Sequence, residues 1–463
     1  MKMRKNATAT LVIALAVPVG GCLSPPPVDE RLAAQPTPKS WSRSGGVEAP
    51  DRWWEAFGDP DLNVLVQQVI EDNLDVKTAL ARLEQARAVA GISRSALFPS
   101  LDAGYTLSES DPANPAQPKS SVTLSAGYEI DLWGRNRQAA RASRTSFAAS
   151  AEDVKAAAIT VEANIAGNWY ELVGFREKLR LLREQQKVNE QYLELLRLKF
   201  GQGKVPRADV LQQEQEVVAK RSEIAGVKTQ IELREHTIAV LLGRAPKDKV
   251  TADVSRLPEL PPMPDTGIPA SLLRKRPDIM AAEYRVRSAN HSLGEAIAAR
   301  FPRLSLSASG AWQGDSVGAT FDNWMTSLAA NLLSPIFDAG RRKREVERNR
   351  AVVEERLAAY RKTVLGAFKE AEDALTREAG QAEHLRELER QVSLGRQLLD
   401  RQRTRYLNGQ TDYLSVMSAL RSLQKLESRH VDARKDSLLF RIELYRALGG
   451  GWEAVVDRIG RED

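Results

Sequence analysis

The sequence predicts a mostly α-helical fold with a small membrane β part. Three features predict it: an internal duplication, two stretches in each copy where apolar and polar residues alternate, and a run of about 66 residues without proline after them. No apolar run reaches the ~18–20 residues that a transmembrane helix needs. Contact with a membrane is therefore expected from the strands.

Composition and motifs exclude several classes of function. The formal net charge is +6, and part of it lies in the first few residues, which argues against nucleic acid as a partner. The single cysteine excludes an internal disulfide framework, and the four histidines lie too far apart for a local zinc site. A phosphate-binding P-loop, with the pattern Gly-x4-Gly-Lys-Ser/Thr, is absent. We therefore expect no catalytic residues, no metal and no enzyme activity.

The N-terminal residues predict a signal peptide and a lipid anchor. A basic start and a short apolar stretch, Ala7 to Val19, are typical of a secretory signal peptide over residues 1–21. Cys22 then follows small residues as in a bacterial lipobox, although Val19 stands where leucine is usual. We expect Cys22 to carry a diacylglycerol and an N-acyl chain, since two or more chains hold a protein stably on a bilayer. A buried free cysteine is the alternative. Leu23, in place of an aspartate, favours sorting to the outer membrane.

Prolines mark the segments that the sequence predicts to be irregular. Residues 22–60 have a proline cluster near their start, so we expect an extended lipidated tether without helix. A second proline cluster over 246–270 predicts a connector between two copies of a repeat. The residues after the second copy, 450–463, are expected to form a C-terminal tail.

The duplication is visible as pairs of matching residues at a constant separation. Gly203 and Gly409 lie 206 positions apart, and Leu-Gly pairs further along show the same offset. A constant offset over so long a stretch is hard to obtain by chance. We therefore predict one repeat over 61–245 and another over 271–449, each with a helix, two strands, a long helix, a turn and a returning helix.

Alternating apolar and polar residues predict two strands in each repeat. The strands are expected at about 100–109 and 121–132 in the first repeat, and at about 303–313 and 323–334 in the second. Strands of about 9–11 residues with one apolar face suit an outer-membrane barrel, whereas a soluble antiparallel sheet with one wet face is the alternative. Four strands cannot close a barrel, because about eight is the small end. Three chains would supply twelve strands, which predicts a homotrimer.

Two long helices are predicted over 135–200 and 341–406, each about 100 Å long at 1.5 Å per residue. The returning helix over 208–242 and the helix over 61–97 would stack end to end alongside them. A seven-residue apolar repeat that includes Asn189 predicts coiled-coil packing. A coiled-coil stalk would explain this repeat equally well, but it would not explain the strands. Strands and helices together predict a tube with a polar interior that conducts passively.

Six motifs resemble those of a known family. They are GYEIDLWGR (127–135), KFGQGKVPRADVL (199–211), RKRPDI (274–279), SPIFDAGRR (334–342), RYLNGQTDYLSVM (405–417) and LYRALGGGW (444–452). They span nearly the whole chain after the signal peptide, and the sequence resembles the TolC-like outer membrane factors, in particular the OprM/NodT-type lipoprotein branch. The resemblance implies a homotrimer with a 12-stranded outer-membrane β-barrel, four strands per chain, continued by a long periplasmic α-helical barrel. It also implies docking to a periplasmic adaptor (membrane fusion) protein and to an inner-membrane pump of the RND type.

The resemblance further implies a gate at the periplasmic end. The family closes this end by ionic and hydrogen-bond links and by rings of aspartate, and the matching positions here are Asp209 and Tyr406. Many relatives carry aspartates where this sequence has Ser415 and Ser418, and Asp412, one turn earlier, could substitute for them. We therefore expect a gate formed by Asp209, Tyr406 and Asp412. Both aspartates could instead act as helix caps or first-turn acids, and the two roles can coexist.

The two turns between long and returning helices are expected at the far tip, where the adaptor would dock. By position, the adaptor-contact residues are Gly201, Gly203, Lys204, Val205, Gly409 and Gln410. The leading interpretation is an exit duct that serves a pump for small molecules. The alternatives are an exit duct for type I protein secretion and a lipid-anchored coiled-coil scaffold without a pore.

Overall fold

The computed structural model describes most of the chain after the expected signal peptide. The described residues are 27–33, 37–47, 50–108, 119–246, 254, 256–314, 317–321 and 323–451. The expected signal peptide, Cys22 and most of the C-terminal tail lie outside them. Two compact units divide the chain: a sheet unit built mainly of 93–141 and 290–350, and a helical unit built of 28–92, 142–289 and 351–463.

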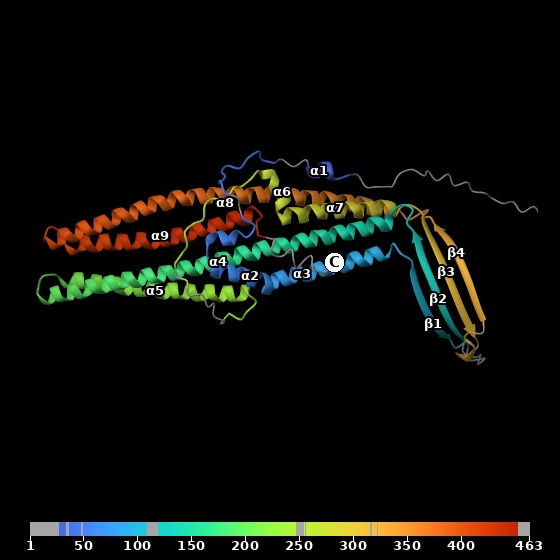
Figure 1. The fold of residues 1–463 in the computed structure, drawn as a ribbon, viewed down its shortest axis with the longest axis horizontal. Helices are drawn as coiled ribbons and strands as arrows, with labels where there is room; N and C mark the ends of the chain where they lie inside the picture. The colour runs from blue at the N-terminus through green and yellow to red at the C-terminus, as the bar shows by residue number, and fades with distance from the viewer. Residues whose placement is uncertain are drawn as a thin grey trace, which may run out of the picture. The chain divides into compact units, whose positions relative to one another are not determined.

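The helices occur in matching pairs, as the duplication requires (Figure 1). The pairs are α3 (Leu74–Ser95) and α7 (Pro277–Ala298) with 22 residues each, α4 (Arg135–Gly201) and α8 (Arg341–Leu407) with 67, and α5 (Arg207–Leu241) and α9 (Tyr413–Ala447) with 35. At 1.5 Å per residue, α4 and α8 are each about 100 Å long. The mostly helical fold with a small sheet is therefore confirmed.

The sheet unit holds one antiparallel sheet whose strands lie in the order β1-β2-β3-β4. The strands are β1 (Ser100–Ser108), β2 (Lys119–Ile130), β3 (Arg303–Gly314) and β4 (Asn323–Leu333). Each expected strand thus has a counterpart whose ends differ from the expectation by at most two residues. Within this sheet β1 and β4 are edge strands, and each pairs with a neighbour on one side only.

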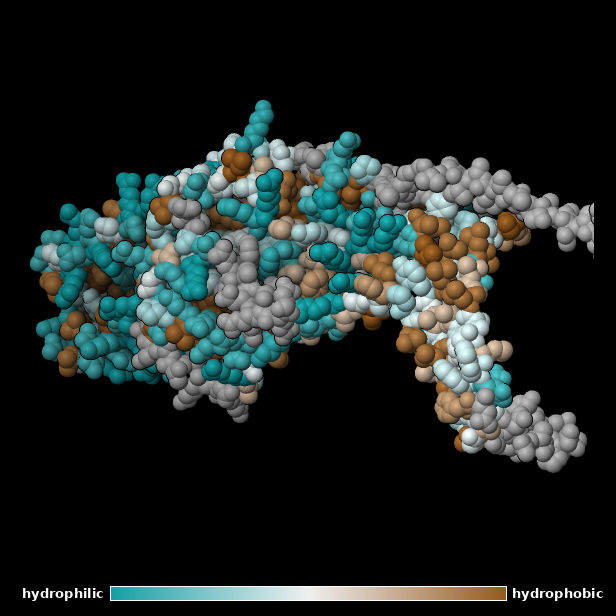
Figure 2. Space-filling view, turned by 45° about the vertical axis from the view of Figure 1, so that its right-hand side comes forward, coloured by the Kyte–Doolittle hydropathy of each residue, from teal (hydrophilic) through white to brown (hydrophobic). Residues whose placement is uncertain are grey.

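The pairing register gives the sheet one apolar and one polar face, because directly paired residues lie on the same face. Two neighbouring rows across all four strands show it: Tyr105, Val122, Trp312 and Trp324 form an apolar row, and Thr106, Ser121, Gln313 and Asn323 form a polar row. The apolar side chains are uncovered: Leu101 and Trp324 are 69% exposed and Leu328 is 83% exposed. In Figure 2, hydrophobic side chains are gathered over the strands.

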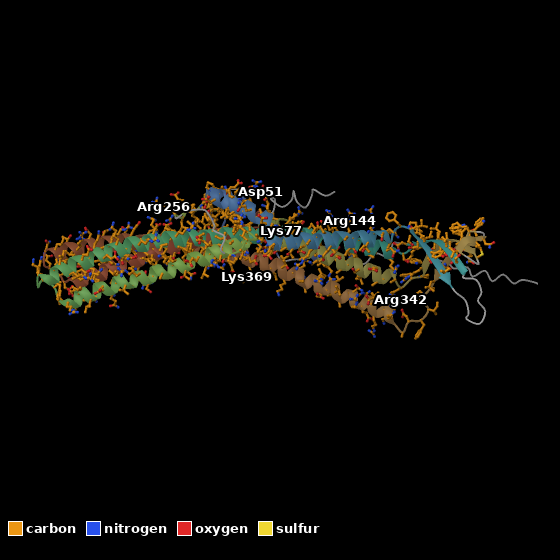
Figure 3. The ribbon with its side chains drawn as sticks, turned by 90° about the horizontal axis from the view of Figure 1, so that it is seen from below. Asp51, Lys77, Arg144, Arg256, Arg342 and Lys369 are labelled. Carbon is orange, nitrogen blue, oxygen red and sulfur yellow. The ribbon has the colours of Figure 1, made fainter. Side chains whose placement is uncertain are left out.

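The helical unit has its main core around a group of aromatic side chains. Trp53 stacks on Tyr445 with ring centroids 5.5 Å apart, and Phe57 lies 5.3 Å from the ring of Tyr170. The indole of Trp169, fully buried in the same core, donates to a carboxylate oxygen of Asp59 at 2.8 Å. Charged residues lie on the outside of the helices, among them Lys77, Arg144 and Lys369 (Figure 3).

Part of the N-terminal tether is helical, contrary to the expectation of an extended segment. Between the prolines at 25–27 and those at 36 and 38, α1 (Asp29–Ala33) forms one short turn of helix. Later in the tether, Trp53–Phe57 forms a 3-10 helix. Packing explains α1: Val28 and Leu32 are buried, and Asp29 pairs with Arg287 on α7 at 2.8 Å. The prolines exclude long helices here, but they leave room for a single turn that tertiary contacts stabilise.

The helix expected over 61–97 is broken in two. The structure has α2 (Pro60–Asp72) and α3, separated by Asn73, whose backbone is extended. The Asn73 side-chain oxygen accepts hydrogen bonds from the amides of Asp75 at 2.8 Å and Val76 at 3.2 Å, so it caps α3. Its side-chain NH2 group donates to the carbonyl of Leu241 at 2.8 Å, which ties the break to the end of α5.

Arginines of α9 hold the connector between the repeats against the helical unit. Arg441 is paired with Glu378 of α8 and donates to the carbonyls of Pro261 and Pro262. Two helical turns earlier on α9, Arg434 donates to the carbonyl of Leu257 at 3.0 Å. Residues 256–263, in the described part of this connector, form no helix or strand, and these arginine side chains satisfy three of its carbonyls. None of the helices in the described residues combines enough length and hydrophobicity to cross a membrane.

Candidate gate at the tips of the helical hairpins

Two hairpin turns, one in each repeat, connect α4 to α5 and α8 to α9. Both use the same glycine-dependent ending, in which Gly203 has φ 68° and Gly409 has φ 71°. The amide of Lys204 donates to the carbonyl of Lys199 at 2.9 Å, and the amide of Gln410 donates to that of Arg405 at 2.9 Å. Each of these hydrogen bonds closes a turn of six residues. Together with the bonds that the Gly203 and Gly409 amides donate to carbonyls three residues earlier, they form Schellman motifs. The duplicated turns therefore have duplicated backbone geometry.

The six residues expected to contact an adaptor lie at or beside these turns. Gly201, Gly203, Lys204, Gly409 and Gln410 are exposed. Val205 is half-buried, because it packs against a small core at the tip that contains Leu196, Tyr413 and Met417. Five of the six residues are thus available at the surface of the chain, and the sixth supports the tip from inside.

Tyr406, the first residue expected at the gate, is held by a lysine. The Lys199 ammonium donates to the Tyr406 hydroxyl at 3.0 Å (Nζ to Oη) and lies 4.3 Å from the centre of its ring. The edge of the Tyr406 ring meets Tyr413, with centroids 5.9 Å apart at an angle of 65°. Among the described residues, no hydrogen bond joins Tyr406 to Asp209. Lys199 and Tyr413 are the neighbours that position this hydroxyl within one chain.

Asp209, the second expected gate residue, is a half-buried acid in the first turn of α5. Its partial burial raises the pKa of its carboxyl above the usual value, and the negative charge of Asp412 raises that pKa further. The two aspartates therefore repel each other across the tip, one from each repeat. In its place in the first turn, Asp209 also carries the favourable charge for a helix N-terminus.

Asp412, the third expected gate residue, caps α9. One of its carboxylate oxygens accepts from the amide of Ser415 at 3.0 Å and from the hydroxyl of the same residue at 2.8 Å. These hydrogen bonds lower the pKa of the Asp412 carboxyl below the usual value. The capping role that the sequence offers as the alternative for Asp412 is present, and it leaves the second carboxylate oxygen outside these bonds.

Sequence reasoning missed Lys199 and Tyr413. Tyr413 follows Tyr406 by seven residues, but the turn between them ends the helix, so a heptad count gives no reason to pair them. Lys199 lies among other basic residues of α4 and has no distinguishing pattern in the sequence. In the described part of the chain, no three His, Cys, Asp or Glu side chains are arranged to hold a metal ion.

Comparison with known proteins gives a consistent result. The family model described as outer membrane efflux protein matches residues 65–244 and 268–450. The pyoverdine export outer membrane protein OpmQ of Pseudomonas aeruginosa is 32% identical, with 98% of each chain covered. OprJ, an outer membrane protein of the same species, is 30% identical, and the alignment covers 99% of this chain and all of OprJ.

Solved structures show the same fold. The outer-membrane channel OprN superimposes with a TM-score of 0.80 at 26% identity, covering 90% of this chain and 98% of OprN. The outer membrane protein VceC of Vibrio cholerae gives a TM-score of 0.79 at 26% identity, covering 88% of this chain and 100% of VceC. The two segments that the family model matches correspond to the two structural repeats.

Proposed function

Because the chain belongs to the outer membrane efflux protein family, we propose that it forms the exit duct of a tripartite efflux system. The resemblance to TolC-like factors that the motifs indicate is confirmed by the family match and by the relatives. OpmQ and OprJ are both named as outer membrane proteins, and OpmQ is named for pyoverdine export, which supports an outer-membrane location for this chain. The duct would conduct small molecules, and the pump would carry out any chemistry and select which molecules are exported.

The observation that carries the proposal is the one-sided sheet with two unpaired edges. Its apolar face leaves Leu328 83% exposed, which is costly in water and favourable in lipid. Its edge strands β1 and β4 present unpaired backbone groups, which a further strand would satisfy. Three copies joined edge to edge give a 12-stranded barrel with lipid outside and the polar face inside. The helices would then form the periplasmic helical barrel.

The partners follow from the two ends of such a duct. The exposed hairpin tips would dock to a periplasmic adaptor protein, which in turn would connect the duct to an inner-membrane RND-type pump. Cys22, with its acyl chains, would anchor each chain in outer-membrane lipid. Asp209, Tyr406 and Asp412 would close the tip until the adaptor engages. No cofactor takes part in passive conduction.

Two neighbouring residues on opposite faces of β4 test the lipid-facing sheet. Leu328→Lys places a charge on the apolar face, which costs about 2–4 kcal/mol at the middle of a bilayer, so we expect loss of trimers from the outer-membrane fraction. Ser327→Lys places the same charge on the polar face and should assemble normally. Equal assembly of both variants, measured as heat-labile trimers on gels, would contradict a lipid-facing apolar face and favour a soluble sheet.

Conductance separates a duct from a scaffold. We expect purified protein to conduct weakly in planar bilayers and an Asp209→Ala/Tyr406→Phe variant to conduct more, because the tip would no longer close. A scaffold without a pore would give folded trimers that stay silent in both forms. A duct for type I secretion would conduct as well, but deleting the gene would then abolish export of a protein rather than lower resistance to small molecules.

A further inference from the structure

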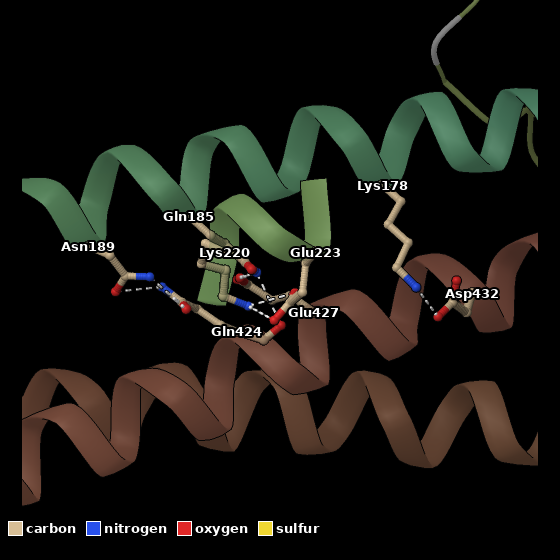
Figure 4. A network of polar contacts seen from close by, with 8 residues as sticks. All are labelled: Lys178, Gln185, Asn189, Lys220, Glu223, Gln424, Glu427 and Asp432. Carbon is tan, nitrogen blue, oxygen red and sulfur yellow. Dashed lines mark hydrogen bonds and ion pairs between the residues drawn. The ribbon is translucent and has the colours of Figure 1, made fainter. Parts of the chain in front are cut away.

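Five buried polar side chains form a continuous ladder between three helices of the helical unit. Gln185 and Asn189 come from α4, Gln213 from α5, and Tyr413 and Gln424 from α9. Each of the five is at most 4% exposed. Figure 4 shows Gln185 and Asn189 of α4 and Gln424 of α9 pointing toward one another. We call these five residues the amide ladder.

Hydrogen bonds link every member of the amide ladder. The Tyr413 hydroxyl donates to Gln213 Oε1 at 2.8 Å, and Gln213 Nε2 donates to the carbonyl of Asn189 at 2.9 Å. Asn189 Nδ2 donates to Gln424 Oε1 at 3.2 Å. Gln185 Nε2 donates to the carbonyl of Gln424 at 3.1 Å. The ladder therefore connects the α4–α5 hairpin of the first repeat to α9 of the second.

Polar groups at such positions fix how helices align along their axes. The apolar side chains above and below the ladder, such as Leu182 and Leu196, can pack in more than one register, because dispersion contacts have little directionality. A buried amide that loses its partner costs its full desolvation, so a helix shifted by one turn of 5.4 Å would break the ladder. The alignment of α9 on the hairpin in this structure makes all three of these bonds between them at once.

The upper end of the ladder reaches the candidate gate. Tyr413 is the first residue of α9, its hydroxyl is the last donor of the ladder, and its ring meets the edge of Tyr406. Tyr413 is also 3% exposed, so it has no freedom to move independently of its neighbours. We infer that the amide ladder fixes the axial register of α9 on the α4–α5 hairpin and thereby positions Tyr406 in the closed duct. The inference rests on the proposed duct function.

Two conservative variants remove the bond at the top of the ladder. Tyr413→Phe deletes one hydroxyl and keeps the ring, and Gln213→Leu replaces the amide with an apolar group of similar size. Loss of one hydrogen bond of about 1 kcal/mol shifts a two-state equilibrium about fivefold. We therefore expect Tyr413→Phe to raise the conductance of the closed trimer in planar bilayers about fivefold. Gln213→Leu also loses the bond to the Asn189 carbonyl, so it should raise the conductance at least as much. Since both variants lose the bond between Tyr413 and Gln213, the double variant should conduct close to Gln213→Leu alone rather than show the sum of the two effects.

Leu182→Ala is the matched control. Leu182 is 1% exposed and packs with Ile224 and Val227 in an apolar core of α4 and α5 that adjoins the ladder but makes none of its hydrogen bonds. Its truncation should lower the thermal midpoint by more than Tyr413→Phe does, because it leaves a cavity. It should leave the conductance of the closed trimer unchanged. A rise in conductance that follows the loss of stability across all variants would overturn the inference.

A second readout does not depend on conduction. Hydrogen exchange of full-length protein in detergent, measured on peptides covering 404–417, should be faster in Tyr413→Phe and Gln213→Leu and unchanged in Leu182→Ala. Unchanged exchange in both ladder variants would overturn the positioning role even where all proteins conduct. If the Asp209→Ala/Tyr406→Phe variant stays silent while exchange responds as expected, the duct proposal fails and the register role of the ladder stands.

Discussion

Two buried glutamates on the long helices differ in one respect that decides how each affects stability. Glu162 on α4 is fully buried, and among the residues that the structure describes neither of its carboxylate oxygens has a hydrogen-bond partner. Glu378 on α8 is also buried, but it is paired with Arg441. Burial without a partner raises the pKa of the Glu162 carboxyl well above its usual value. Burial of a glutamate side chain is therefore unfavourable for stability at position 162, whereas the ion pair offsets it at position 378.

The pH dependence at Glu162 follows from that raised pKa. In acid both the folded and the unfolded chain hold the proton, so Glu162 has no effect on stability there. As pH rises past the usual glutamate range, the unfolded chain ionises while the folded chain keeps its proton, so the free energy of unfolding falls. Each unit by which the two pKa values differ costs about 1.4 kcal/mol once the pH exceeds both.

Glu162→Gln should therefore stabilise the protein at pH 8 and leave it unchanged at pH 4. Glu378→Gln is the control, because it removes a charge from a buried pair and should destabilise at neutral pH by about 3–5 kcal/mol. Thermal midpoints of the protein in detergent, measured at both pH values, check the two variants. A Glu162→Gln midpoint that is lower than wild type at pH 8 would mean that the carboxylate has a partner.

At the scale of single elements, the ends of the long helices follow from the sequence and the interruptions do not. Glycines with positive φ lie beside both ends of α4 and of α8, and glycine ends helices for backbone reasons alone. The break at Asn73 depends on a bond from its side chain to Leu241, which lies in a different part of the sequence. The single turn of α1 depends on burial of Val28 and Leu32. Tertiary contacts support both interruptions, and the local sequence pattern contains no information on those contacts.

The turn glycines give a prediction at this scale. Gly201 and Gly203 both have open space where a side chain would begin, but only Gly203 has a positive φ, of 68°. Gly203→Ala should cost about 1–2 kcal/mol, because an L-residue is strained in that region. Gly201→Ala, two residues earlier at the end of α4, should be neutral or stabilise by about 0.5–1 kcal/mol. Thermal midpoints compare the two, and similar losses for both would mean that the turn can relax into another conformation.

At the scale of the whole molecule, the sequence predicts the features that are periodic or duplicated along the chain. It does not predict which residues of one repeat contact which residues of the other. Alternation predicts the strands, and the offset between Gly203 and Gly409 predicts the two hairpins, since both patterns are periodic along one chain. The amide ladder and the Lys199–Tyr406 bond join helices that lie far apart in sequence. A heptad count places Asn189 among core positions, but it does not predict which amide side chain on α9 forms a hydrogen bond with it. The partners of the candidate gate therefore require the structure.

Two large apolar side chains that follow β4 are almost fully exposed in the single chain. Ile336 is 91% exposed and Phe337 is 89% exposed. By contrast, Phe301 in the same unit stacks on Trp133 within the chain, with ring centroids 5.0 Å apart. Because β4 is an edge strand, the residues that follow it would lie beside the next copy in the proposed ring. Phe337 is thus a candidate for a contact that only the assembled trimer makes.

Phe337→Ser should weaken assembly without affecting the fold of the single chain. Burying a phenylalanine side chain is worth about 1.5–3 kcal/mol, which is about tenfold or more at one interface, at about 1.4 kcal/mol per tenfold. Over three identical interfaces the association constant of the trimer should fall by about a thousandfold or more. Phe301→Ser removes a contact within the chain and should lower the thermal midpoint instead. Light scattering coupled to size exclusion in detergent measures the trimer fraction, and circular dichroism at 222 nm checks the helices. A Phe337→Ser protein that remains trimeric at the dilution where wild type begins to dissociate would show that lipid, rather than a neighbouring copy, covers this side chain.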